Sequence, residues 1–135
     1  MKNIILLIAL SAAAYYAYNN YYLDSASEVS QHSLSDIQNN PIPKDSLFDL
    51  WHVTALKMCN GATESFNITQ SQCLTKIESK KESCKVSEGR SAPAVIESEY
   101  EAKKLGKAYL LCAVPGYHCN GIEVKSEEEA RRYCQ

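Results

Sequence analysis

The sequence has no excess of basic residues, and this excludes one large class of function. Its 135 residues carry 14 Lys and Arg against 16 Asp and Glu, which gives a formal net charge of −2. A domain that binds nucleic acid through a basic surface has the opposite balance. The composition is also not that of a disordered chain, because 45% of the residues are hydrophobic and only 22% are charged. We therefore expect one globular domain that does not bind nucleic acid.

The motifs that mark most enzyme and cofactor sites are also missing. No C-x-x-C pair occurs, which excludes the spacing of zinc ribbons, thioredoxin-like redox sites and c-type haem attachment. No G-x-G-x-x-G, P-loop or G-x-S-x-G occurs either. The histidines stand apart at positions 32, 52 and 118, and we interpret His52, which lies between two apolar residues, as structural. The sequence therefore predicts no catalytic residue, no cofactor and no metal ion.

Cysteine is absent from the first 58 residues, and this part of the chain begins like an export signal. Lys2 precedes an apolar run over residues 4–14, and a tyrosine-rich stretch follows. Tyrosine favours the membrane–water interface, so we expect an uncleaved signal anchor over residues 1–23, with residues 3–23 in the membrane. Cleavage after Ala14 is the alternative, and it would give a soluble periplasmic or secreted protein. We expect a single-pass inner-membrane protein with its C-terminal domain in the periplasm.

Glycine and cysteine are both absent from residues 24–45, which are rich in Ser, Gln, Asn and Asp. The apolar residues Val29, Leu34 and Ile37 are too few to bury an apolar face, and the prolines of residues 41–43 favour extended chain. We expect a polar tether that holds a domain of residues 46–135 away from the membrane. An N-terminal arm packed on the surface of that domain is the alternative.

Helical spacing of apolar residues predicts that this domain is mainly α, with three to four helices. We expect helices over residues 46–59, 69–84, 93–113 and 126–134. Thr69 and Gln72 fit a capping box at the start of the second helix. Pro93 suits the first turn of the third helix, and Gly106 inside that helix indicates the close approach of another backbone.

One short β-hairpin is predicted near the C-terminus. Asn120-Gly121 between alternating residues is a strong signal for a two-residue turn. This turn gives the hairpin one apolar face and one polar face, with His118 and Glu123 paired on the polar face. The apolar face consists of Tyr117, Cys119, Ile122 and Val124.

Six cysteines predict three disulfides that staple an exported domain. They are Cys59, Cys73, Cys84, Cys112, Cys119 and Cys134. If the second and third helices are antiparallel neighbours, Cys84 lies at the end of the bundle opposite Cys112, so we expect Cys84 to pair with Cys134. The other four cysteines then pair locally, as 59–73 and 112–119, or across helices. We interpret His118, next to Cys119, as an exposed histidine and not as a metal ligand.

A small stapled domain without catalytic motifs is typical of a protein-interaction module. We expect a non-enzymatic module on the extracytoplasmic side of the membrane, with an unidentified protein partner that contacts Phe48 and Trp51. A more specific form is an inhibitor or immunity-type protein against an exported enzyme or toxin. A structural subunit of a cell-envelope or secretion complex is the first alternative. A small secreted enzyme is the second, and it would require His52 or His118 to be essential.

Overall fold

The structure is a computed structural model that describes residues 34–134. The expected signal anchor and the first part of the expected tether lie outside the described residues. The described part of the chain is mainly helical, with three disulfides and a small hairpin. Within residues 34–134, no helix combines the length and the apolar character needed to cross a membrane.

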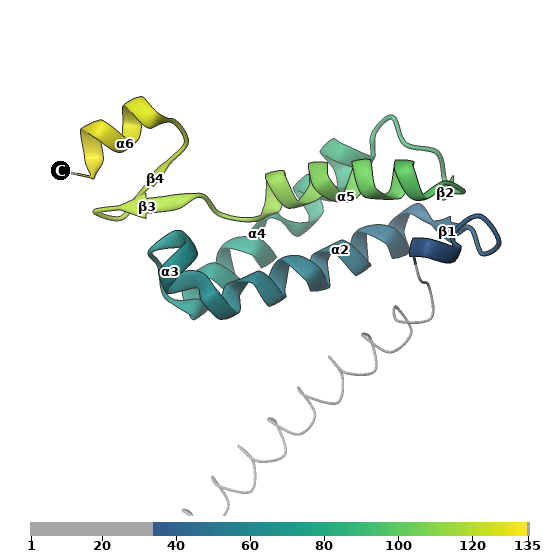
Figure 1. Cartoon of the computed structure of the whole chain (residues 1–135), viewed down its shortest axis with the longest axis horizontal. Coiled ribbons are helices and arrows are strands. Elements are labelled where there is room, and N and C mark those ends of the chain that lie inside the picture. Colours follow the sequence, from purple (N-terminus) through teal and green to yellow (C-terminus); the bar gives the residue numbers. More distant parts are fainter. Residues whose placement is uncertain (1–33, 135) are drawn as a thin grey trace, which may run out of the picture.

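Three helices form the body of the domain. They are α2 (Lys44–Met58), α4 (Gln70–Gly89) and α5 (Glu99–Ala113), and each contacts the other two. Figure 1 shows α2 and α5 starting at the same end of the molecule, with α4 running in the opposite direction. A 3₁₀ turn (Cys59–Gly61) and the short helix α3 (Ala62–Phe66) connect α2 to α4 at the other end. The body of the domain is therefore a small bundle of three mutually contacting helices.

Side-chain caps mark the starts of α4 and α5. The capping box of α4 is confirmed: Thr69 accepts from Gln72 N, and the Gln72 side chain accepts from Thr69 N. α5 begins at Glu99 and not at Pro93, because Ser98 caps it by accepting from Glu101 N. α4 continues beyond the expected end at Cys84 to Gly89.

The residues just before α2 pack on the domain, so the described part of the expected tether matches the alternative of a packed arm. A 3₁₀ turn over Leu34–Asp36 and the strand β1 (Ile42–Pro43) precede α2, and β1 pairs antiparallel with β2 (Val95–Ile96). Ile37 and Ile42 are each only 2% exposed. The expectation that apolar residues here are too few to bury a face was wrong, because β2 and α5 supply the rest of that face. Its buried members are Ile37, Ile42, Leu47, Ile96 and Ala102.

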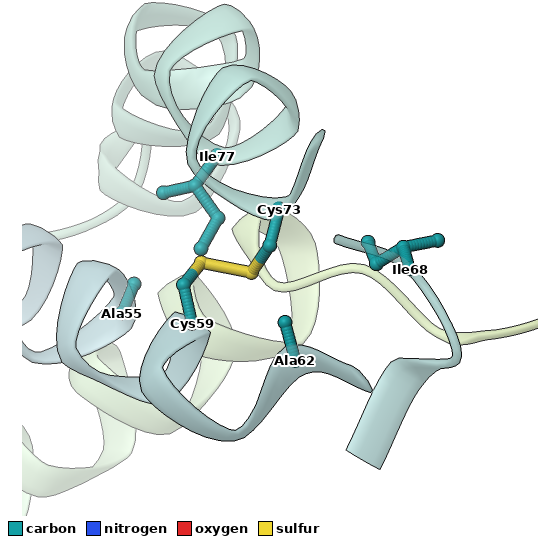
Figure 2. Close-up of a cluster of buried hydrophobic side chains, with 6 residues drawn as sticks. All are labelled: Ala55, Cys59, Ala62, Ile68, Cys73 and Ile77. Atoms are coloured by element: carbon teal, nitrogen blue, oxygen red, sulfur yellow. A yellow bond between two sulfur atoms is a disulfide. The ribbon is translucent and has the colours of Figure 1, made fainter. Parts of the chain in front are cut away.

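A second buried cluster surrounds the disulfide between Cys59 and Cys73, at the end of the bundle where α2 turns toward α4. Figure 2 shows this bond between the two chain segments, with Ala55, Ile68 and Ile77 beside it. Both cysteines are fully buried. The sequence left open whether these two cysteines pair locally or across helices, and in the structure they pair locally.

The other two disulfides differ from the expectation. Cys84 bonds Cys112, and Cys119 bonds Cys134, so the expected Cys84–Cys134 and 112–119 pairs were wrong. Cys84 lies five residues before the end of α4, whereas Cys112 lies thirteen residues into α5. The two cysteines lie at the same height along the bundle axis because the first residue of α5 lies about eight residues of helical rise, or ~12 Å, past the last residue of α4. The segment between them, which includes β2, crosses this offset.

The C-terminal unit is a hairpin followed by one short helix. β3 (Tyr117–Cys119) and β4 (Ile122–Val124) pair in the expected register, with Asn120 and Gly121 both at positive φ, as a two-residue turn requires. α6 (Glu127–Tyr133) begins at the Ser126 cap and packs on β4. This unit lies beyond the end of α5 in Figure 1, and Cys119–Cys134 closes it.

The hairpin is not divided into a buried apolar face and an exposed polar face. Tyr117 and Ile122 on the apolar face are 47% and 44% exposed, whereas His118 on the polar face is 3% exposed. His118 is held by two hydrogen bonds: its Nδ1 lies 2.8 Å from Gly116 O, and its carbonyl accepts from Asn67 Nδ2 at 2.8 Å. The expectation of an exposed histidine was therefore wrong.

Candidate functional site

The two aromatic residues that the sequence proposed as partner contacts lie in different surroundings. Phe48 is fully buried, with its ring centroid 5.6 Å from that of Tyr109. Its side chain therefore belongs to the core and offers no surface to a partner in this fold. Trp51, one turn further along α2, is only partly buried and lines an open groove. Of the two residues, Trp51 alone reaches the candidate site.

Trp51 is held in the groove by Gly106 of α5. A Cβ atom at position 106 would overlap the indole Cε2 and Nε1 atoms. We expected Gly106 to allow the close approach of another backbone, but it makes room for the Trp51 side chain instead. The indole Nε1 is buried and has no hydrogen-bond partner within the described residues. Close packing on α5 leaves this N–H unable to reach water or an acceptor, which is a cost that the contact must offset.

The groove runs along one face of α5 and has a volume of about 700 Å³. α2 contributes Trp51 and Met58 to one side, and the loop after α5 closes one end together with β4. Its lining consists of Trp51, Met58, Lys80, Lys103, Lys107, Leu110, Leu111, Cys112, Val114, Pro115, Gly116, Glu123, Val124 and Lys125. A volume of this size is typical of sites that take a ligand or several side chains of a partner.

Apolar side chains in this groove are open to solvent. Leu111 is 77% exposed and Met58 is 42% exposed. A single exposed leucine is ordinary, but these two lie together with Leu110, Val114 and Val124 in one lining. Exposed apolar residues that gather in a concave surface are typical of a binding site.

The charged residues of the lining are four lysines and one glutamate: Lys80, Lys103, Lys107, Lys125 and Glu123. Lys103 forms an ion pair with Glu99 one turn earlier in α5, and the other three lysines form no ion pair within residues 34–134. The groove therefore presents a positive rim, although the chain as a whole is slightly acidic.

Glu123 is committed to a structural contact. Its Oε1 accepts from Gly116 N at 2.7 Å, and this hydrogen bond holds the pKa of the carboxyl below its ordinary value. Partial burial opposes this shift, and the positive charges of Lys80 and Lys125 lower the pKa further. The carboxylate is therefore ionised near neutral pH and fixes β4 to the loop that follows α5.

One other cluster has the composition of a catalytic site. His52 Nδ1 lies 2.8 Å from the Tyr109 hydroxyl, and His52 Nε2 lies 3.1 Å from Glu78 Oε1. A carboxylate that orients a histidine beside a hydroxyl is the pattern of base-assisted nucleophiles. Here, however, Tyr109 is fully buried, and burial raises its pKa to about 12. A substrate cannot reach the hydroxyl in this fold, so the cluster ties α2, α4 and α5 together.

The cysteines nearest to His118 in the sequence are both in disulfides. Cys119 is bonded to Cys134, and Cys112 is bonded to Cys84. Within residues 34–134, no group of three or more His, Cys, Asp or Glu residues is placed so that it could hold a metal ion. The backbone carbonyl of His118 accepts from Asn67, the residue just after α3, and β3 contacts α3.

Sequence reasoning missed most of the groove. Leu111 did carry a signal, because it falls outside the apolar stripe that buries Ala102, Gly106, Tyr109 and Ala113. An apolar residue on the polar side of an amphipathic helix is a candidate for a partner contact. The contribution of β4 and Lys80 had no comparable signal, because these residues meet α5 only in the folded chain.

Comparison with known proteins found no matching family model, no matching curated protein and no matching solved structure. Function is therefore inferred from the residues and contacts of this chain alone.

Proposed function

We propose that the protein is a non-enzymatic protein-interaction module exposed on the extracytoplasmic side of a membrane, and that the groove along α5 is its binding surface. The observation that carries this proposal is the 77% exposure of Leu111 within a concave apolar lining. A residue of this kind costs solvation free energy in the free protein and contributes binding free energy once a partner covers it.

The disulfides support the proposed location outside the cytosol. All six cysteines are paired, which is compatible with an oxidising compartment outside the cytosol. Anchoring through residues 3–23 is part of the proposal, and fractionation tests it. Release of the protein by osmotic shock without detergent would contradict the anchor but leave the binding module unaffected.

The non-enzymatic part of the proposal is supported by the placement of the two described histidines. His52 and His118 are both buried, and each is hydrogen-bonded within the fold. A His118→Ala variant that folds but loses the cellular function, while the groove remains intact, would favour the enzyme alternative.

Site-specific photo-crosslinking tests the binding surface. A photoreactive amino acid replaces Leu111 in the full chain, expressed in its native cells, and the matched control replaces Val86, which is 65% exposed and lies outside the groove. We expect a discrete protein adduct from position 111 and none from position 86. Equal labelling from both positions, or no adduct at position 111, would contradict the proposal.

The identity of the adduct then separates the two forms of the function. A single exported enzyme or toxin supports an inhibitor or immunity-type protein. A member of a multi-subunit envelope assembly supports a structural subunit.

A further inference from the structure

The groove combines apolar side chains with lysines at both of its ends, and this pattern specifies the chemistry of the partner. We infer that the groove takes an acidic amphipathic helix of the partner protein, with carboxylates on either side of an apolar stripe. This inference rests on the proposed function and names the kind of segment that the binding surface recognises.

The length of the groove suits a short helix. The lining extends from Lys103 in α5 to Val114, the residue just after the helix, which is a rise of eleven residues or about 16 Å along the helix axis. A partner helix of about three turns covers the same distance, and its apolar residues would fall at i, i+3, i+4 and i+7. Leu110 and Leu111 supply apolar surface between Lys107 and Val114, and Met58 of α2 belongs to the same lining.

The lysines lie on both sides of this apolar centre. Lys103 lies at the start of the α5 part of the lining, and Lys107 follows one turn later, before Leu110 and Leu111. Lys80 lies one turn before Cys84 in α4, which is antiparallel to α5, so the Cys84–Cys112 bond places Lys80 toward Gly116, beyond the end of α5. Lys125 follows Glu123 by two residues, and Glu123 is hydrogen-bonded to Gly116. Positive charge is therefore present near both ends of the groove.

This distribution distinguishes between possible occupants. A single-chain lipid carries one charged head group and would engage one end of the groove. A helix with carboxylates in its first and last turns engages both ends at once. Three lysines of the lining form no ion pair within the described part of the chain: Lys80, Lys107 and Lys125. A carboxylate of the partner can therefore bind them without first breaking an ion pair within residues 34–134. Charge complementarity thus favours an acidic peptide segment.

The test uses the full chain with its disulfides intact, reconstituted into phosphatidylcholine vesicles. Peptides are selected on it from a random 12-residue display library and then synthesised without tryptophan. Trp51 is the only tryptophan of the chain and lines the groove, so its emission reports occupancy directly. We expect the selected peptides to be acidic, to carry apolar residues at helical spacing and to shift the emission of Trp51.

Two substitutions in the groove have matched controls outside it. Lys107→Glu reverses a charge in the lining, and Lys104→Glu makes the same change at an exposed neighbour outside it. Leu111→Ser removes an apolar contact, with Val86→Ser as its control. We expect each groove variant to weaken peptide binding about tenfold, and each control to leave it unchanged. Raising the salt concentration should also weaken binding.

Several results would overturn the inference. They are enrichment of basic or neutral peptides, no enrichment at all, and binding that Lys107→Glu and Leu111→Ser do not weaken. An emission shift on vesicles that contain phosphatidylglycerol, without peptide, would assign the groove to a membrane surface. A shift that depends on protein concentration alone would assign it to a second copy of this chain.

This experiment and the crosslinking experiment fail independently. A partner crosslinked at position 111 through a segment that is not acidic would retain the proposed function and overturn this inference. Acidic peptides that bind the groove, without a cellular adduct at position 111, would support this inference and contradict the proposed function.

Discussion

The indole of Trp51 lies directly against Gly106, with no room between them for a single methyl group. This contact joins α2 to α5 and places the only tryptophan of the chain in the lining of the groove. It links the fold to the proposed binding surface, because any change at position 106 moves a residue that lines the groove.

Gly106→Ala should therefore destabilise the domain, although alanine is the better helix former. The gain in helix propensity is about 1 kcal/mol, whereas displacing a packed indole costs typically ~1–3 kcal/mol or more. We expect a lower free energy of unfolding in urea and a changed emission maximum of Trp51. Gly61→Ala is the matched control, because a Cβ there meets only Ser65 Oγ at 3.7 Å. Equal stability of the Gly106→Ala variant and the wild type would show that Trp51 is not fixed by this contact.

The disulfide map can be measured directly. Peptide mapping of the non-reduced protein should recover Cys59 with Cys73, Cys84 with Cys112, and Cys119 with Cys134. Any peptide that joins Cys84 to Cys134 would contradict the arrangement of α4 and α5.

Removing individual disulfides should have different consequences. Replacing Cys84 and Cys112 by serine removes a bond between two core helices, and we expect a loss of about 2–4 kcal/mol in the free energy of unfolding. Replacing Cys119 and Cys134 should release α6, which packs on β4, and leave the three-helix body folded. Circular dichroism and amide hydrogen exchange distinguish these results. Global unfolding of the second variant would mean that the hairpin unit is part of the core.

The buried Tyr109 hydroxyl makes stability depend on alkaline pH. Burial, with the carboxylates of Glu78 and Asp49 as further causes, raises its pKa from 10.0 to about 12. The folded state therefore favours the protonated phenol. The resulting stabilisation is complete below pH 10 and disappears as the pH rises from 10 to about 12.

Tyr109→Phe isolates this effect. At pH 8 the variant should be less stable by about 1–3 kcal/mol, because His52 Nδ1 loses its buried partner. At pH 11.5 the difference between wild type and variant should shrink by about 2 kcal/mol. Urea unfolding of both proteins at the two pH values measures the change. A constant difference would mean that the phenol is not protonated preferentially in the fold.

Glu123 should make the hairpin sensitive to acid. Because its folded pKa lies below that of a free glutamate, its stabilising effect is present above about pH 4.5 and is lost as the pH falls through the folded value. In Glu123→Gln at neutral pH, the Gly116 amide should exchange hydrogen about two- to tenfold faster. The exposed Glu97 gives the control, and Glu97→Gln should leave this exchange rate unchanged. Equal rates in wild type and Glu123→Gln would show that the carboxylate does not fix β4.

Much of this fold was predictable from local chemistry. The capping box at Thr69 and the Asn120-Gly121 turn each depend on neighbouring residues alone, and both were found where they were predicted. The central turns of α2, α4 and α5 were predictable from the helical spacing of apolar residues. The start of α5 was predicted wrongly at Pro93, because Val95 and Ile96 pair with β1 and the helix begins only after the Ser98 cap.

The cysteine partners and the binding surface depended on how the helices are offset. Cys112 meets Cys84 because α5 is shifted along α4, and no local pattern specifies such a shift. The same shift places Leu111 and Lys107 in the lining of the groove, together with Lys80 of α4 and with β4. The sequence by itself determined a stapled helical domain with a C-terminal hairpin, since caps, turns and periodicity act over a few residues. Only the tertiary structure decided which cysteines bond and which apolar residues stay exposed, because contacts between distant segments depend on the relative positions of whole helices.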